Sequence, residues 1–143
     1  MKPVDQSIVD PKRGDCFRAS IASLFELELE QVPHFKLFKD KWFPIYNYFI
    51  RSLGWEYEGY AFPKTHKISE TCNVNGYLCA DVPSRTFPNI GHSVVIDLKG
   101  VVVHDPNPNR LWQGVNVLES GELTGWHLLE KRPLSIDADA GVS

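Results

Sequence analysis

The stretch that decides the fold is GDCFRASIASLFEL, residues 14–27. Its apolar side chains recur at helical spacing, which predicts an amphipathic helix: Phe17, Ile21, Leu24 and Phe25. Asp15 precedes this run and is a favourable N-cap, because its carboxylate can accept the unpaired amide donors of a first helical turn. Prolines and a glycine within residues 1–14 predict an irregular lead-in. A helix is therefore expected to begin at Cys16.

Two further helical segments are predicted before residue 55. A short turn or helix follows Leu29 and is closed by Val32-Pro33. A longer amphipathic helix is expected to start near Lys39–Trp42, because Pro44 is tolerated only in a first turn. Gly54 is a plausible residue to end this helix.

After Gly54 the apolar period changes to two, which indicates strands. The clearest β signal is GHSVVIDLKGVVVHDPNP, residues 91–108, in which two β-branched runs flank Lys99-Gly100. Other strands are predicted around Trp55–Phe62, at Tyr77–Val82, at Val115–Leu118 and at Trp126–Leu129. Helices followed by an antiparallel sheet predict an α+β fold.

Length and composition predict one globular domain. The chain has 143 residues, of which 43% are apolar and 23% charged. We expect a single domain over residues 1–132 and a loose tail over residues 133–143. A net charge of −3 without any run of basic residues argues against nucleic-acid binding. No segment has the length of a membrane span or the character of a secretion signal, so a cytoplasmic protein is expected, in the host cytoplasm if a phage encodes it.

The three cysteines, Cys16, Cys72 and Cys79, are too few and too unevenly spaced for a disulfide framework. Zinc sites use closer pairs than Cys72 and Cys79 provide. We therefore predict neither a metal nor a cofactor, and both of these cysteines are expected to be spectators.

Cys16 is the candidate nucleophile. Unpaired N–H groups and the dipole at a helix N-terminus favour a thiolate, and the thiolate is the reactive form. The Cys16 N–H would also be free to stabilise an oxyanion. The competing interpretation is a small buried apolar side chain, as most free cysteines are.

The predicted hairpin supplies a base and its partner. If Lys99-Gly100 is a two-residue loop, Val94 lies opposite Asp105 and His92 opposite Asn107, with all four side chains on one face. A Leu98-Lys99 loop would place His92 opposite Asp105 itself, whereas a three-residue loop would place no polar partner beside His92. An imidazole that acts as base needs such a partner to orient it. The alternative is a histidine at a strand end, with an Asp-Pro turn that has no catalytic role.

These segments resemble the papain-like cysteine peptidase fold. The likeness is closest to the double-glycine (bacteriocin-processing) peptidase-like branch and to small uncharacterised bacterial and phage proteins of that type. It covers roughly residues 6–108, except the middle third, and keeps the order Cys, His, Asp. The resemblance implies N-terminal helices, with the nucleophile at a helix start, packed on a C-terminal antiparallel sheet. It also implies a catalytic triad of Cys16, His92 and Asp105.

The chain departs from that family in two ways. The family usually carries an oxyanion-stabilising Gln about six residues before the nucleophile, whereas here the upstream Gln6 lies ten residues before Cys16. Cell-wall endopeptidases of the fold carry a polar residue on the next strand, where His104 stands, but alternation puts His104 on the face opposite His92. Asn107 and then His104 are therefore the alternatives to Asp105.

The leading hypothesis is a thiol hydrolase: a peptidase, isopeptidase or amidase/deamidase that acts on a protein or peptide through an acyl-enzyme. The alternative is a non-catalytic papain-fold module that captures a host or partner protein. His34, His66 and His127 are expected to have no catalytic role, and tryptophans such as Trp42 to pack in the core or at its rim. Residues 55–90 are expected to shape the specificity pocket.

Overall fold

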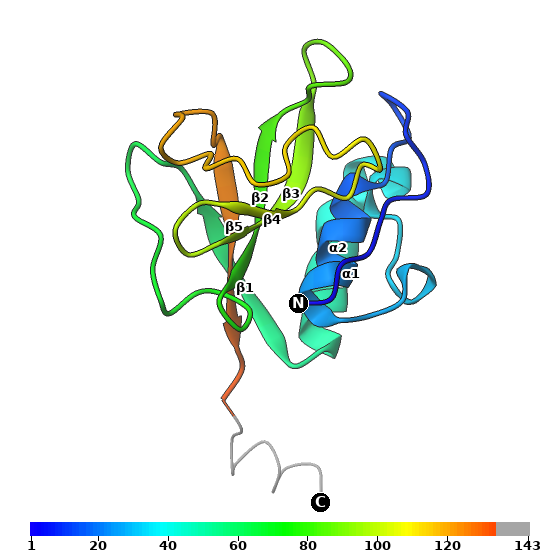
Figure 1. Cartoon of the computed structure of the whole chain (residues 1–143). Helices are drawn as coiled ribbons and strands as arrows, with labels where there is room; N and C mark the ends of the chain where they lie inside the picture. Colours follow the sequence, from blue (N-terminus) through cyan, green and yellow to red (C-terminus); the bar gives the residue numbers. More distant parts are fainter. Residues whose placement is uncertain (134–143) are drawn as a thin grey trace, which may run out of the picture.

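The computed structural model of the chain describes residues 1–133 (Figure 1). The helical elements come first and the strands follow, as the sequence predicted: α1 Cys16–Phe25, η1 Leu29–Gln31, η2 Phe35–Lys41, α2 Trp42–Ser52, β1 Trp55–Ala61, β2 Tyr77–Pro83, β3 Gly91–Asp97, β4 Val102–His104 and β5 Gly125–Lys131. The described residues cover the predicted domain, residues 1–132, and Pro133 of the predicted tail, while residues 134–143 of that tail lie outside the described residues.

The five strands form one antiparallel sheet in the order β1-β5-β2-β3-β4. Both α-helices lie on the same side of this sheet (Figure 1), where α1 packs on β2 and β3 and α2 packs on β1. The α+β prediction is therefore confirmed.

Strand alternation divides the apolar residues between the two sheet faces. The face toward the helices buries Cys79 and Val95 with α1 and α2, and the other face buries Leu78, Ala80 and Val94 beneath the segment after β4. Trp112 and Trp126 are the largest side chains of that second core, and each is 1% exposed. By the same alternation Asp81 and Ser93 lie on the helix-covered face, whereas His92 lies on the other face, at the start of β3.

The predicted strand at Val115–Leu118 is wrong. This segment forms one isolated bridge, between Val101 and Asn116. Val115 and Val117 do make backbone hydrogen bonds with Val102 and Gly100, so the β-branched residues lie beside the β3–β4 turn. The chain turns sharply on both sides of this contact, at Gly114 and Gly121, which have positive φ angles, and it leaves the sheet edge before a ladder can form.

Candidate active site

Cys16 is the first residue of α1, but Asp15 does not cap that helix as predicted. The Asp15 side chain is 0% exposed and turns back to the lead-in, where Oδ1 accepts the N–H groups of Ser7 and Ile8 at 3.0 and 2.8 Å. The Ser7 hydroxyl donates to Oδ2 at 2.8 Å. No side-chain cap therefore occupies the first-turn amides of α1. Asp15 was expected to accept the first-turn N–H groups of α1, but its carboxylate holds the lead-in in place instead. The N–H groups beside the Cys16 thiol therefore do not donate to Asp15.

The Cys16 sulfur lies against an open edge of the sheet. Strand β4 ends at His104, opposite Val95, so the first part of β3 has no strand partner on that side. The Ser93 N–H there donates to Cys16 Sγ at 3.4 Å. Because β4 is short, the sulfur takes the position that a backbone carbonyl would otherwise fill.

Burial and hydrogen bonding act in opposite directions on the Cys16 thiol. Burial raises its pKa, while the hydrogen bond and charge of the neighbouring His92 ring, together with the Ser93 N–H, lower it. The lowering contributions win and the net pKa of Cys16 is below the ordinary value, although the Asp81 carboxylate opposes the shift. This is the environment that makes a cysteine nucleophilic.

His92 is held by Asp105. His92 Nε2 lies 2.7 Å from Asp105 Oδ1, and the two side chains are 10% and 1% exposed. Burial lowers the pKa of His92, but hydrogen bonds to Asp105 and Cys16 outweigh it and raise the pKa to about 9. Since Nε2 faces Asp105, Nδ1 is the ring nitrogen left for the thiol.

Asp105 has its own set of donors. Its Oδ2 accepts the Trp112 N–H and its Oδ1 accepts the Asn107 N–H, each at 3.0 Å. Burial raises the pKa of Asp105, and the hydrogen bonds from His92 and these two amides lower it below the ordinary range. A buried carboxylate with this many donors is fixed in orientation, which in turn fixes the imidazole.

The loop that brings His92 and Asp105 together differs from the prediction. Asp97 and Val101 close a three-residue loop, Leu98–Gly100, through the Asp97 N–H and the Val101 carbonyl at 3.0 Å. A three-residue loop was expected to leave His92 without a polar partner, and that expectation is wrong. In the β3–β4 pair Ile96 lies opposite Val102 and Val95 lies opposite His104, so a bulge in β4 adds one residue between these two pairs. Beyond the bulge the pairing is the one that a two-residue Lys99-Gly100 loop would have produced.

The two alternative partners of His92 lie elsewhere. Asn107 contributes its backbone N–H to Asp105, while its side chain contacts Thr86 and the Asn109 N–H. His104 lies on the helix-covered face, as alternation predicted, with Nε2 2.8 Å from the Val4 carbonyl oxygen.

Gln6 lies beside the Asp105 loop but is not hydrogen-bonded to Cys16. Its backbone N–H donates to the Pro106 carbonyl at 2.9 Å and its Nε2 donates to the Ile8 carbonyl at 2.8 Å. Its Oε1 is buried and finds no hydrogen-bond partner within residues 1–133. The lead-in thus brings Gln6 close to the site although it lies ten residues before Cys16 in the sequence. Of the two N–H groups of the Gln6 side-chain amide, one donates to Ile8 and the other is available to a substrate.

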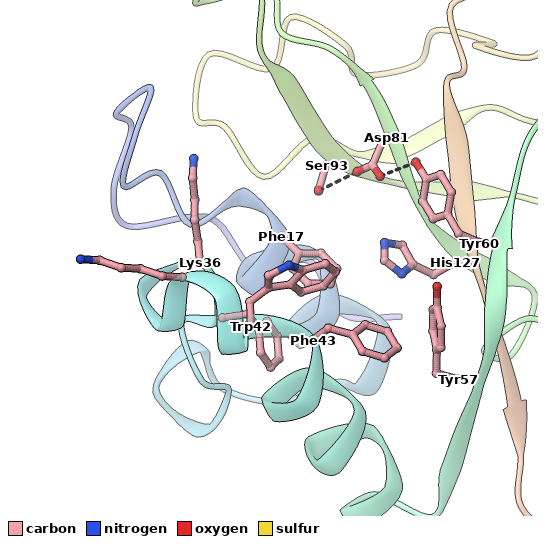
Figure 2. A pocket seen from close by; sticks show the side chains of 11 residues that line it. Phe17, Lys36, Trp42, Phe43, Tyr57, Tyr60, Asp81, Ser93 and His127 are labelled. Carbon is pink, nitrogen blue, oxygen red and sulfur yellow. Dashed lines mark hydrogen bonds between the residues drawn. The ribbon is translucent and has the colours of Figure 1, made fainter.

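A cleft of about 730 Å³ lies between the helices and the sheet (Figure 2). Its lining comes from both helices, η2 and four strands, and comprises Phe17, Phe35, Lys36, Lys39, Trp42, Phe43, Tyr57, Tyr60, Asp81, Ser93 and His127. A smaller hollow of about 180 Å³ contains Cys16 and shares Phe17, Phe35, Lys36 and Ser93 with it. The two hollows are adjacent, and Ser93 stands between them.

Sequence reasoning missed Asp81 and Ser93 as site residues. They are direct partners in the β2–β3 register, and the Ser93 hydroxyl donates to Asp81 Oδ1 at 2.9 Å. One signal was available, because an acid inside the apolar run Tyr77–Val82 is unusual for a strand in the middle of a sheet. Residues 55–90 contribute Tyr57, Tyr60 and Asp81 to the cleft, and η2, α1, α2, β3 and β5 supply the rest of its lining.

Of the three histidines expected to have no catalytic role, His34 lines the smaller hollow together with Cys16, and none of the three is hydrogen-bonded to the thiol within residues 1–133. His34 and His66 contact the Arg13 carbonyl and Thr65. His127 lines the large cleft, where its Nδ1 lies 3.2 Å from the Tyr46 hydroxyl and burial lowers its pKa. It is therefore a neutral wall residue.

Cys72 and Cys79 form no disulfide with each other or with Cys16. In the part of the chain that the structure describes, no group of three or more His, Cys, Asp or Glu side chains is arranged to hold a metal ion. None of the helices in residues 1–133 combines the length and apolar character that crossing a membrane requires.

Comparisons of the chain with protein-family models, with curated proteins and with solved structures find no match. The case for a function therefore depends on the geometry of the site.

Proposed function

We propose that this chain is a papain-like thiol hydrolase that cleaves an amide or isopeptide bond through an acyl-enzyme on Cys16. The observation that carries the proposal is the series from the buried Asp105 to the partly buried His92 and Cys16. It combines a lowered thiol pKa with a raised imidazole pKa. Such opposed shifts in adjacent groups are typical of a thiolate–imidazolium pair.

Each residue has a definite part in the reaction. The Cys16 sulfur attacks the carbonyl carbon, and the proton on His92 Nδ1 passes to the departing amine nitrogen as the C–N bond breaks. Water then adds to the thioester while His92 takes its proton, and breakdown of that adduct releases the carboxylic acid and restores the Cys16 thiolate. Asp105 holds the ring in one orientation throughout.

The oxyanion formed in both halves of the reaction needs N–H donors. The Cys16 N–H at the start of α1 is one candidate, because Asp15 does not cap this turn. The uncommitted N–H of the Gln6 amide is the second candidate. We expect the substrate to be a protein or peptide.

The test compares cysteines within one molecule. The protein is treated with iodoacetamide at pH 6.5, and mass spectrometry of its peptides follows the alkylation of each cysteine. Cys16 is expected to react at least about tenfold faster than the partly exposed Cys72, because more of it is thiolate. Equal rates for Cys16 and Cys72 would remove the basis for a hydrolase.

The outcome also separates the enzyme from a papain-fold binding module. A module that only captures a partner would keep its biological effect in a Cys16→Ala variant, whereas a hydrolase would lose it. Cys72→Ala is the matched control and should leave that effect unchanged.

A further inference from the structure

Asp81 is a carboxylate in the large cleft without a cationic partner. Its two oxygens accept the Tyr60 hydroxyl at 2.6 Å and the Ser93 hydroxyl at 2.9 Å, and both donors are neutral. None of the ion pairs formed within residues 1–133 includes Asp81. A partly buried negative charge that is hydrogen-bonded but not neutralised favours the binding of a positive charge beside it.

The arrangement around Asp81 is rigid. The Tyr60 ring packs directly on the backbone of Gly125, where an added Cβ would lie 2.2 Å from Tyr60 Cε1. Burial and the Asp81 carboxylate both raise the pKa of Tyr60, so its hydroxyl remains protonated and donates to Asp81. The charge is therefore held in one position before any ligand arrives.

The other walls suit a cation with an aliphatic stem. Figure 2 shows the rings of Phe17, Trp42 and Phe43 across the cleft from Asp81, with Tyr57 at the side. Aromatic faces attract cations and also bury methylene groups. An anionic group at the same depth would lie beside the Asp81 charge and be repelled.

Lys36 and Lys39 are the charges that oppose this assignment. Both are exposed at the mouth of the cleft, and the Lys36 ammonium donates to the Pro11 carbonyl at 3.4 Å. Water and salt screen charges at such positions. The more enclosed Asp81 therefore determines the sign of the group that binds inside.

Ser93 connects this pocket to the reacting atom. Its N–H contacts Cys16 Sγ at 3.4 Å, and its hydroxyl contacts Asp81 at 2.9 Å. A side chain that reaches Asp81 thus belongs to a residue at or next to the bond that Cys16 attacks.

We infer that the cleft is a specificity pocket for a basic side chain, lysine or arginine, of the substrate, with Asp81 as its counter-ion. This inference rests on the proposed hydrolase function for its biological meaning, but binding to the pocket does not require catalysis. The two can therefore be tested separately.

The binding experiment uses the full chain with Cys16→Ala, so that no reaction occurs. Nα-acetyl-lysine N-methylamide and its neutral counterpart Nα-acetyl-norleucine N-methylamide are titrated, and tryptophan fluorescence is followed because Trp42 lines the cleft. The lysine compound is expected to bind about tenfold more tightly, the effect of one partly desolvated cation contact. A Nα-acetyl-glutamate N-methylamide should bind more weakly than either.

Adding Asp81→Asn should abolish the preference for lysine over norleucine. Asp40→Asn is the matched control, since it removes one negative charge from exposed η2 and should leave the preference intact. Equal binding of lysine and norleucine, tighter binding of glutamate, or a preference that survives Asp81→Asn would each overturn the inference. The lysine–norleucine comparison needs no change at position 81, so it remains decisive if Asp81→Asn does not fold.

Failure of the pocket and failure of the enzyme give different results. An unreactive Cys16 in the iodoacetamide experiment contradicts the hydrolase and leaves the lysine preference to be measured. A reactive Cys16 with no lysine preference contradicts only the pocket.

Discussion

The start of α1 and the middle of β2 each carry a cysteine on the helix-covered side of the sheet, Cys16 partly buried and Cys79 fully buried, and the two thiols have opposite properties. Burial raises the pKa of both. At Cys79 the only other influences are the negative charges of Asp81 and Cys16, so its pKa is well above the ordinary value. At Cys16 the His92 ring and the Ser93 N–H reverse the shift. Burial alone thus makes a thiol inert, and reactivity depends on the donors that surround it.

The largest effect is expected from removing the donor that distinguishes the two thiols. In His92→Ala, burial and Asp81 remain at Cys16, and both raise its pKa. Alkylation of Cys16 by iodoacetamide at pH 6.5 should slow by about tenfold or more, because the thiolate fraction falls once the group that lowers the thiol pKa is removed. His66→Ala, which changes an exposed histidine, is the control. An unchanged rate in His92→Ala would mean that another group activates the thiol.

Weakening that donor should have a smaller effect. Asp105→Asn removes the charge that helps to raise the pKa of His92 to about 9, and burial would then lower that pKa. An NMR titration of the His92 ring should measure this lower pKa. Alkylation of Cys16 at pH 6.5 should slow by about tenfold for each unit by which the pKa of Cys16 rises toward its ordinary value.

Asn107→Ala provides the matched control for Asp105→Asn. This variant keeps the backbone N–H that supports Asp105 and removes only a side chain that does not contact His92. If Asn107→Ala and Asp105→Asn slowed alkylation equally, Asp105 would not be the group that orients the ring.

The pH dependence of stability sharpens the comparison further. The raised pKa of His92 stabilises the folded state fully below about pH 6.5, and this contribution is lost as the pH rises through about 9. The lowered pKa of Cys16 stabilises the folded state at pH values above the ordinary thiol pKa. This contribution is lost as the pH falls through the pKa that Cys16 has in the folded state. In the wild type the two contributions oppose each other over the same range.

In Cys16→Ala only the histidine contribution remains. This contribution is smaller than in the wild type, because Cys16 itself helps to raise the pKa of His92 and Asp105 alone remains to do so. The free energy of unfolding of Cys16→Ala should still fall as the pH rises above about 6.5, more steeply than that of the wild type, in which Cys16 offsets the fall. Urea denaturation at several pH values measures both slopes. Parallel slopes would show that Cys16 and His92 do not share a proton.

The smallest effect on reactivity is expected at the other thiol. Cys79→Ala should change Cys16 alkylation less than about twofold, because the raised pKa of Cys79 keeps it protonated and uncharged and Cys79 is not among the groups that shift the pKa of Cys16. It should lower the free energy of unfolding by about 1–2 kcal/mol, since Cys79 is 0% exposed and its loss leaves a small cavity. A large loss of Cys16 reactivity in a stably folded Cys79→Ala protein would contradict the contrast between the two thiols.

Local sequence was sufficient to predict what depends on neighbours along the chain. The helical spacing after Asp15 predicted a helix that begins at Cys16. The period of two after Gly54 predicted all five strands, two of them as the hairpin that contains β3 and β4. Alternation also predicted that Asp105 shares a face with His92 and that His104 does not. These features follow from backbone geometry, which repeats every few residues.

Contacts between distant segments settled the rest. The bulge that realigns Asp105 with His92, the partners of Asp15, and the pairing of Asp81 with Ser93 and Tyr60 each involve residues separated by seven or more positions. The cleft draws its walls from seven helices and strands, so none of those segments contains it alone. Periodicity specifies the direction of a side chain within its element, whereas the group it meets depends on how the elements pack.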